Sequence, residues 1–497
     1  MSDVQPKLAN GYQALIPILS LIAMLFLSRW FFEDSSSSGP NQIALILSAA
    51  IGILVGLYNG FTWTDMEGAM VKGISLSMGA IFILLIVGSL IGTWILAGIV
   101  PTMIYYGLDI MNPSIFFLAS CLICAFIALA TGSSWTTVST IGIALVGIAT
   151  AMNLNLGLTA GAVISGSYFG DKLSPLSDTT NLAPAMAGTD LFTHIRHMLW
   201  TTIPSMTIAC ILFFILGFFF DHPQNPSEIA AIQDAIQAQF NVGPHLLIPL
   251  LLVLVLVYKK VPAFPALLIG ALIGGLFAVL FQQEAVMRYV GEGVPKWRAM
   301  LQGPWMAMFG EYTMTSDNAA LQDLLNGRGG MSSMLSTVWL ILSAMMFGAV
   351  MERTGVLEVM ANKILSMAKS TGSLVVATLG TSIGMNVIAS DQYIAIVIPG
   401  RMFRAEFLNR KLAPKNLSRC LEDAGTLTSP LVPWNTCGAY MAQTLQVATL
   451  TYLPFCFFNL LNPIISAIYG FTGFSMEKLE EGAEVEDLVV QAEAKHS

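Results

Sequence analysis

Residues 158–186 read LTAGAVISGSYFGDKLSPLSDTTNLAPAM, so a polar block at residues 170–181 interrupts apolar sequence on both sides. Pro175 removes a backbone N–H donor and breaks a helix, which leaves nearby carbonyl groups free. Carbonyls, hydroxyls and carboxylates are the hard oxygen ligands that a small cation prefers. The block therefore predicts a cation site at a broken helix. The alternative is a solvated cytoplasmic loop in which Asp171 and Lys172 face water.

The composition places this block in a membrane protein. Of the 497 residues, 55% are hydrophobic and only 10% are charged, whereas a soluble domain carries about 25% charged residues. Apolar runs approaching the roughly 20 residues that span a bilayer recur along the chain. They lie near residues 13–32, 41–58, 76–100, 113–131, 135–151, 158–170, 198–220, 245–258, 262–281, 336–351, 372–389, 391–400, 424–445 and 451–472.

These runs predict an all-α integral membrane protein surrounded by the lipid bilayer. The segments at 135–151, 158–170 and 391–400 are bordered by polar, Gly and Pro residues. Irregular backbone of this kind occurs at membrane depth only where protein or a water-filled cavity covers it. We therefore expect broken helices or re-entrant hairpins. No basic patch indicates a nucleic-acid partner.

Lysine and arginine residues mark the cytoplasmic loops of a membrane protein. Residues 401–419 carry six of them, which predicts a cytoplasmic loop, whereas residues 33–40 and 221–244 carry none and are expected outside. These assignments place both termini in the cytoplasm, including an acidic tail at 473–497. They place the mixed segment 282–335 outside, as surface or amphipathic helices.

Two motifs recur in the same order in the two halves of the chain. Thr131-Gly-Ser-Ser-Trp135 corresponds to Ile388-Ala-Ser-Asp-Gln392, 257 residues on, and Leu173-Ser-Pro-Leu176 corresponds to Thr428-Ser-Pro-Leu431, 255 residues on. The loop after the first hairpin is uncharged and its counterpart is strongly basic, so equivalent loops are expected on opposite sides. This predicts two inverted-topology repeats with the site at the midplane, where interrupted segments meet.

The predicted parts are N-terminal helices (1–75), a first repeat (76–220), connecting helices with an external segment (221–335), a second repeat (336–472) and the tail (473–497).

The second half holds a matching break at residues 423–437, DAGTLTSPLVPWNTC, with two prolines. Its candidate ligands are the side-chain oxygens of Thr428, Ser429, Asn435 and Thr436. Pro433 stands where a counterpart of Asp178 is expected, so the two breaks are chemically unequal. Glu422 and Asp423 either belong to the site or mark the interfacial end of a helix.

Two further polar interruptions supply candidate ligands within apolar runs. They are Thr131, Ser133 and Ser134 in the first half and Asn386, Ser390 and Asp391 in the second. Asp391 either caps a short helix or binds an ion. Both roles are compatible, because a cap residue at a broken helix lies beside the backbone N–H groups and dipole of that helix.

Longer motifs carry a family resemblance. The runs 130–135 (ATGSSW), 161–184 (GAVISGSYFGDKLSPLSDTTNLAP) and 188–197 (GTDLFTHIRH) closely resemble the NhaC family of sodium/proton antiporters, and 427–438 (LTSPLVPWNTCG) is similar to its second conserved stretch. The resemblance implies the architecture of the ion transporter superfamily, with inverted repeats, a scaffold part and a transport part in a bacterial inner membrane. It is compatible with a homodimer. The residues it marks as the site are Asp171, Ser174, Ser177, Asp178, Thr179, Thr180 and Asn181.

The first functional hypothesis is a Na⁺/H⁺ antiporter that works by alternating access, with no cofactor and with Na⁺ and H⁺ as the transported ions. Na⁺ is expected to bind at Asp178, Ser177, Thr179 and Asn181. Asp178 and Asp171 are the favoured coupling groups, because a buried carboxylate beside a cation site binds a proton or the cation, but not easily both.

The second hypothesis is a Na⁺-coupled carrier or exchanger of a small carboxylate or amino acid. Members that resemble this chain exchange sodium and malate against protons and lactate. A midplane arginine would favour a carboxylate, and Lys172 is the only candidate cation that the sequence offers. The chain contains neither HExxH nor GxSxG, so an enzyme is not expected. The repeat disfavours a channel.

Overall fold

The chain is described by a computed structural model over residues 6–32, 36, 39–219 and 226–479. Within these ranges it forms helices and two isolated β-bridges. Nine of the described helices are long and apolar enough to cross a membrane, or up to eleven such spans if each of two bent helix pairs counts as one. The predicted all-α membrane fold is confirmed. The expected acidic tail lies outside the described residues from 480 onward.

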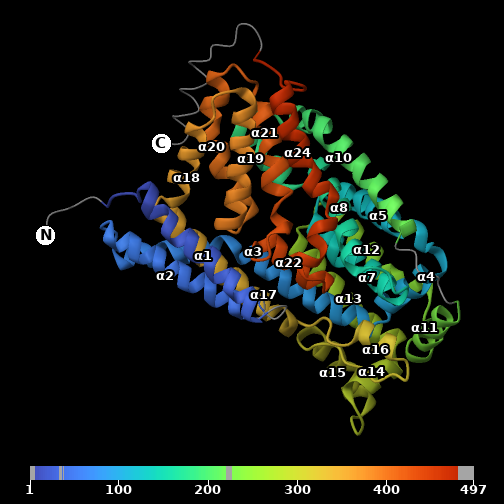
Figure 1. Cartoon of the computed structure of the whole chain (residues 1–497). Coiled ribbons are helices and arrows are strands. Elements are labelled where there is room, and N and C mark those ends of the chain that lie inside the picture. The colour runs from blue at the N-terminus through green and yellow to red at the C-terminus, as the bar shows by residue number, and fades with distance from the viewer. Residues whose placement is uncertain (1–5, 33–35, 37–38, 220–225, 480–497) are drawn as a thin grey trace.

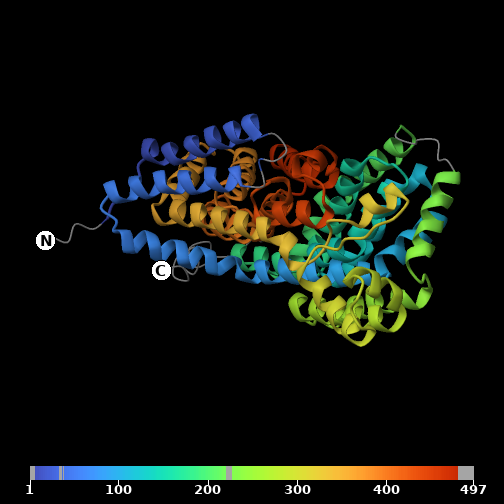
Figure 2. The same ribbon diagram turned by 90° about the horizontal axis from the view of Figure 1, so that it is seen from below.

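One side of the molecule is a layer of long helices that lie side by side (Figures 1 and 2). They are α1 (Gly11–Phe32), α2 (Pro40–Tyr58), α3 (Trp63–Leu96), α13 (Ala263–Phe281) and α17 (Leu335–Arg353). The long helix α3 begins with a capping box, in which Thr62 and Asp65 satisfy each other's backbone N–H groups. Gly73 and Gly88 let α3 approach α17, since a side chain at either position would overlap that helix or the turn before it.

The first half of the remaining layer contains a hairpin and a broken helix. The hairpin consists of α5 (Phe116–Thr131), α6 (Ser134–Thr137), a π-helical turn (Val138–Gly142) and α7 (Ile143–Ala151). The broken helix consists of α8 (Leu156–Leu173) and α9 (Asp178–Ala187), and α10 (Leu191–Phe219) follows it. Gly166 and Gly170 bring α8 against α5 closely enough that a Cβ would overlap its backbone.

The second half repeats this order. Its hairpin is α19 (Thr371–Ile388) with α20 (Gln392–Asn409). Its broken helix is α21 (Pro414–Leu421) with a π-helical turn (Glu422–Thr426), an irregular stretch and α22 (Thr436–Leu445). The helix α18 (Val356–Ser366) precedes the hairpin, and α24 (Phe457–Thr472) is the last helix of the described residues. The two hairpins lie at opposite ends of the molecule in Figure 1.

The prediction of a loop at 401–419 is wrong. α20 continues to Asn409 and α21 begins at Pro414, so only a short turn separates the two helices. The basic residues belong mainly to helix ends, and Arg419 is fully buried. A cluster of positive charge predicts a side of the membrane, but it does not predict secondary structure.

Left-handed backbone positions recur at a fixed spacing in the two halves. The pairs are Gly98 and Gly355, Gly132 and Ser390, Asn153 and Lys411, and Gly188 and Gln446, each 257 or 258 residues apart and each with φ between 52° and 85°. The chain therefore changes direction at equivalent places in both halves. The inversion of the two halves relative to the membrane stays a prediction.

The Ser-Pro-Leu motifs predict a spacing of 255 residues between the two helix breaks. The structure places the caps Ser177 and Asn435 258 residues apart, because the second break (427–435) is longer than the first (174–177).

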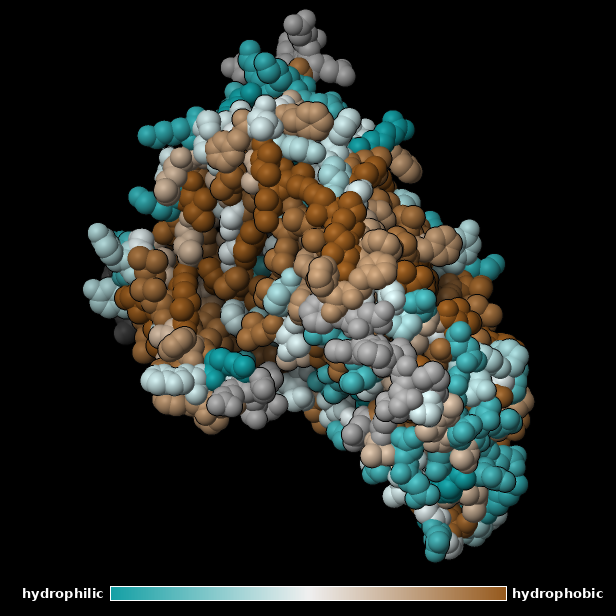
Figure 3. All heavy atoms as spheres, turned by 45° about the vertical axis from the view of Figure 1, so that its right-hand side comes forward, coloured by the Kyte–Doolittle hydropathy of each residue, from teal (hydrophilic) through white to brown (hydrophobic). Residues whose placement is uncertain are grey.

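Polar elements project at one end of the molecule. The expected surface helices of 282–335 are present as α14 (Gln283–Val290), α15 (Lys296–Phe309) and α16 (Ala319–Leu325). The elements α4 (Ile99–Ile110), α11 (Pro226–Gln239) and α12 (Ile248–Tyr258) lie nearby. In Figure 3 the lower part, over these helices, is largely hydrophilic, while a broad apolar area covers the body above.

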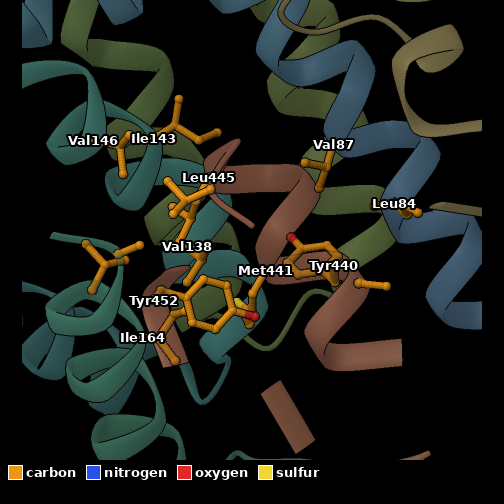
Figure 4. Packing of buried hydrophobic residues seen from close by; sticks show 14 of the residues in the cluster. Leu84, Val87, Val138, Ile143, Val146, Ile164, Tyr440, Met441, Leu445 and Tyr452 are labelled. Atoms are coloured by element: carbon orange, nitrogen blue, oxygen red, sulfur yellow. The ribbon is translucent and has the colours of Figure 1, made fainter. Parts of the chain in front are cut away.

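The two halves share one apolar core. Figure 4 shows side chains of α3, of the first-half hairpin and of α22 that point toward one another, among them Leu84, Val138, Tyr440 and Leu445. All four are 5% exposed or less. Burial of such side chains contributes about 1.5–3 kcal/mol each where they are removed from water. This core holds the hairpin tips and the helix breaks in register.

Candidate cation site

A cavity of about 340 Å³ lies where both hairpin tips and both helix breaks meet, beside the middle of α3. Eight of the predicted site residues line it: Ser133, Ser134, Asp171, Ser177, Asp178, Thr179, Asp391 and Thr436. They come from both halves of the chain. Three of them are carboxylates, and among the described lining residues there is no Lys, Arg or His.

Asp171 is anchored at the first hairpin tip. Its Oδ2 accepts hydrogen bonds from the backbone N–H (3.1 Å) and the hydroxyl (2.6 Å) of Ser134, the first residue of α6. Gly132, with φ of 71°, turns the chain before this helix, and Ser133 caps it. Free N–H groups at a helix start favour a negative charge. The tip thus holds one carboxylate at the cavity wall.

The first helix break supplies a further part of the wall. Ser177 caps α9, and Asp178 is its first residue. Asp178 is exposed, whereas Ser177 and Thr179 are buried. The expected alternative, in which Asp171 and Lys172 face water, does not describe this segment, because both side chains are buried. Pro175, Asp178 and Asn181 are the exposed residues of the break.

The second hairpin tip matches the first in chemistry. Ser390 has φ of 61°, and Asp391 caps α20 by accepting hydrogen bonds from the N–H groups of Tyr393 (2.8 Å) and Ile394 (3.2 Å). The N–H of Thr436, at the second break, donates to the Ser390 carbonyl at 3.0 Å. Asp391 therefore does cap a helix, and the same carboxylate lines the cavity. Ion binding by Asp391 stays a prediction.

Nine predicted ligands do not line the cavity: Thr131, Ser174, Thr180, Asn181, Asn386, Ser390, Thr428, Ser429 and Asn435. Asn386 donates to the Gly425 carbonyl at 2.7 Å and accepts from Asn435 at 3.1 Å. Asn181 donates to the Pro175 carbonyl at 3.0 Å. These amides satisfy carbonyl groups that the helix breaks leave without helical partners. Their place in the structure is therefore to support the breaks.

A fully buried ion network lies behind the cavity. Lys172 bonds to Asp423 and, at 2.9 Å, to Asn462. Arg419 lies 3.9 Å from the other oxygen of Asp423. Glu422 accepts a hydrogen bond from Thr179. Lys172, Arg419, Glu422 and Asp423 are each 0% exposed.

This network corrects three expectations. Lys172 does not face water, and Glu422 and Asp423 do not mark an interfacial helix end. Arg419, assigned to a loop from the sequence, is a second buried cation beside Lys172. Neither basic side chain lines the cavity.

Four polar or aromatic lining residues were missed from the sequence: Ser77, Trp135, Gln392 and Tyr393. Trp135 and Gln392 directly follow the predicted tip residues Ser134 and Asp391, so their position in the sequence was enough to predict them as lining residues. The ring of Trp135 stacks on Tyr440 at 4.0 Å and joins the two halves. Ser77 lies within a long apolar helix, where the sequence gives no sign of a site.

Two larger cavities lie toward the two ends of α17. One of about 940 Å³ contains Glu352 and Arg353 and shares Leu76 and Tyr393 with the cation cavity. The other, of about 570 Å³, lies near Leu340 at the start of the helix and shares no lining residue with the cation cavity. The cation cavity thus adjoins the cavity at the Arg353 end of the molecule through these two residues and shares no wall residue with the cavity at the other end.

Residues 166–474 match the sequence profile described as the Na⁺/H⁺ antiporter family. The chain belongs to this family. The matched span covers both helix breaks and the second hairpin, so it contains half of the residues that line the cavity described above. Family membership confirms the resemblance seen in the sequence motifs and identifies a transporter family.

Relatives within this family carry different names. The chain is 39% identical over 437 residues to the Na⁺/H⁺ antiporter NhaC of Alkalihalophilus pseudofirmus, covering 88% of this chain and 91% of the relative. It is 37% identical to the malate-2H⁺/Na⁺-lactate antiporter of Bacillus subtilis, covering 95% and 96%. It is 35% identical to the arginine/ornithine antiporter ArcD of Halobacterium salinarum, covering 95% and 94%.

Proposed function

We propose that the protein exchanges Na⁺ for H⁺ by alternating access at the cation cavity. The observation that carries this proposal is the charge of the cavity: Asp171, Asp178 and Asp391 line it, and no basic side chain does so among the described residues. Hydroxyls and carboxylates are the ligands that a hard cation prefers. An anionic substrate would meet repulsion from all three carboxylates.

Coupling follows from competition at the carboxylates. A carboxylate that lines the cavity is stabilised by one positive partner, either a bound proton or a nearby Na⁺. Binding of Na⁺ then favours release of a proton, and protonation favours release of Na⁺. Asp178 and Asp171 are the proposed coupling groups, with Ser177 and Thr179 as neutral oxygen ligands. Asn181 lies outside the cavity lining and is the weakest of the proposed ligands.

A transport assay on everted vesicles tests this proposal. In wild-type vesicles, Na⁺ is expected to dissipate an imposed pH gradient. Asp178→Asn and Asp171→Asn should lower the rate more than about tenfold, because loss of a charged ligand removes at least about 1.4 kcal/mol of binding. Asp190→Asn is the matched control, since Asp190 is exposed and lies outside the cavity.

Two results would contradict the proposal. Wild-type rates in the Asp178→Asn variant would remove that residue from the site. The absence of a response to any alkali cation in wild-type vesicles would remove the function.

We also propose that the Arg353 end of the molecule faces the cytoplasm of a bacterial inner membrane. The turn 410–413 and the segment 475–479 contact each other, and the basic side chains of Lys415 and Arg419 bond to that segment. Positive residues favour the cytoplasmic side. Reporter fusions at positions 410 and 230 should then report opposite sides. A common side would contradict this orientation.

An organic cation or amino acid is the second candidate substrate. A cavity of about 340 Å³ falls in the roughly 300–1,000 Å³ range of small-molecule sites. The carboxylates would suit an ammonium or guanidinium group. A panel of amino acids and small carboxylates, added with and without Na⁺, tests it: an increase in exchange or in thermal stability with one compound identifies the substrate class.

A further inference from the structure

Glu422 reaches from the second half of the chain to the hydroxyls of the first helix break. It begins the π-helical turn at 422–426 and is fully buried. Its Oε1 accepts a hydrogen bond from the Thr179 hydroxyl at 3.0 Å, and its Oε2 has no hydrogen-bond partner among the described residues. Glu422 itself does not line the cavity.

The charged side chains near Glu422 form hydrogen bonds with other residues. Lys172 is bonded to Asp423 and Asn462, and Arg419 bonds to Ser475 at 2.9 and 3.0 Å. Asp171, the remaining charged neighbour, is bonded to Ser134. Among the described residues, Thr179 donates the hydrogen bond that the carboxylate of Glu422 accepts, and the charge of Lys172 acts on this carboxylate from nearby.

The bond fixes the direction of a short chain of hydroxyls. The hydroxyl oxygens of Ser177 and Thr179 lie 3.2 Å apart. A hydroxyl carries one proton to donate and two lone pairs that accept. Since Thr179 donates its proton to Glu422, Ser177 must donate to Thr179. Both protons then point along the chain toward Glu422, and a lone pair of each oxygen remains available to the cavity.

We infer that Glu422 is a positioning residue that orients the Ser177 and Thr179 hydroxyls as cation ligands. A cation is bound by oxygen lone pairs and repelled by hydroxyl protons, so the site requires this orientation. The inference rests on the proposed Na⁺/H⁺ exchange and adds a residue from the second half that acts through Thr179. The required property of Glu422 is its oxygen acceptor, not its charge.

Na⁺ titration of exchange in the full-length protein tests this inference. Glu422→Ala should raise the half-saturating Na⁺ concentration up to about tenfold, the expected effect of one hydrogen bond, and Thr179→Val should raise it at least as much, because it also removes a ligand oxygen. The maximal rate should change much less. Glu422→Gln keeps an oxygen acceptor and should return the half-saturating concentration to within about twofold of wild type. The double variant Glu422→Ala/Thr179→Val should be no worse than Thr179→Val alone, because that single change already removes the bond.

Thr201→Val is the matched control. Thr201 is equally buried and its hydroxyl donates to a carboxylate, Asp423, at 3.1 Å, but it does not line the cavity. Its half-saturating Na⁺ concentration should equal that of wild type. If Glu422→Ala does not fold, three other variants test the same point. Glu422→Gln keeps the acceptor and Thr179→Ser keeps the hydroxyl, so both should resemble wild type. Thr179→Val keeps neither the hydroxyl nor the bond and should not.

The outcomes separate this inference from the proposed function. An unchanged half-saturating concentration in Glu422→Ala, or a Glu422→Gln variant as impaired as Glu422→Ala, overturns the positioning role while wild-type exchange persists. Absence of Na⁺-dependent exchange in the wild type overturns the function itself.

Discussion

Two residues at the hairpin tips differ in how well they suit their backbone conformation. Gly132 and Ser390 both have left-handed φ values, 71° and 61°. A side chain in this region costs about 1–2 kcal/mol, and a Cβ at position 132 would also overlap Leu176. We therefore expect Gly132→Ala to lower the free energy of unfolding by about 2 kcal/mol. Thermal unfolding in detergent measures the effect as a lower Tm.

Ser390→Gly is the counterpart of that change. It relieves strain in the folded state but increases the freedom of the unfolded chain, and these effects nearly offset, to within about 0.5 kcal/mol. A Tm for Gly132→Ala equal to that of wild type and Ser390→Gly would contradict the assignment of strain at the tip.

At the scale of residues, the sequence identified the charged members of the cavity more readily than the neutral ones. Asp171 and Asp391 stood out because ionisable groups are rare in apolar sequence. Asn386 and Asn435 were predicted as ligands, but the structure uses them to bond to backbone and to each other. An amide can serve either purpose, and only the position of the free carbonyls decides between them.

Among the elements, the segment 475–479 is held against the end of α21 by polar contacts. Glu477 bonds to Lys415, its carbonyl accepts from Ala413, and Arg419 donates to Ser475. The hydrogen bond from Lys415 lowers the pKa of Glu477. A carboxyl group with a lowered pKa stabilises the folded state above its unfolded pKa of about 4.3, and this stability is lost as the pH falls through the folded value.

We therefore expect the segment 475–479 to lose protection against hydrogen exchange as the pH falls below the ordinary glutamate pKa of about 4.3 and through the lowered pKa of Glu477. Hydrogen exchange of its backbone amides, compared at pH 7 and at about pH 3 after correction for intrinsic rates, measures this. Glu477→Gln should weaken protection at pH 7 and remove most of the difference. Equal protection at both pH values in the wild type would contradict the role of the Glu477 contacts.

The order of elements was more predictable than their boundaries. The apolar runs and the repeated motifs indicated broken helices in both halves, because Pro175 and the prolines of 423–437 cannot continue a helix. The register between halves was not predictable, since the longer second break shifts the matching Ser-Pro pairs by three residues relative to the caps. The same residue types recur where the same chemistry is needed, whereas the backbone conformation sets the positions of the helix caps. The two spacings therefore differ.

For the whole molecule, the sequence predicted the class of fold, because 55% hydrophobic residues in bilayer-length runs leave few alternatives. It did not predict that the cation cavity shares wall residues with the cavity at the Arg353 end and none with the cavity at the other end. Trp434 lines the cavity at the Leu335 end of α17, and its indole N–H donates to the Val387 carbonyl at 2.7 Å. It stands two residues before Thr436, which lines the cation cavity.

Trp434 should therefore close the Leu335 end in this conformation. A cysteine at Gly79 provides the probe, because Gly79 lines the cation cavity and has open space at its Cβ position. A membrane-impermeant thiol reagent should label Gly79→Cys faster from the Arg353 end than from the Leu335 end. Adding Trp434→Ala should speed labelling from the Leu335 end, whereas Trp434→Phe keeps most of the ring and should not. Unchanged labelling in the Trp434→Ala variant would show that the second break closes this end without its tryptophan.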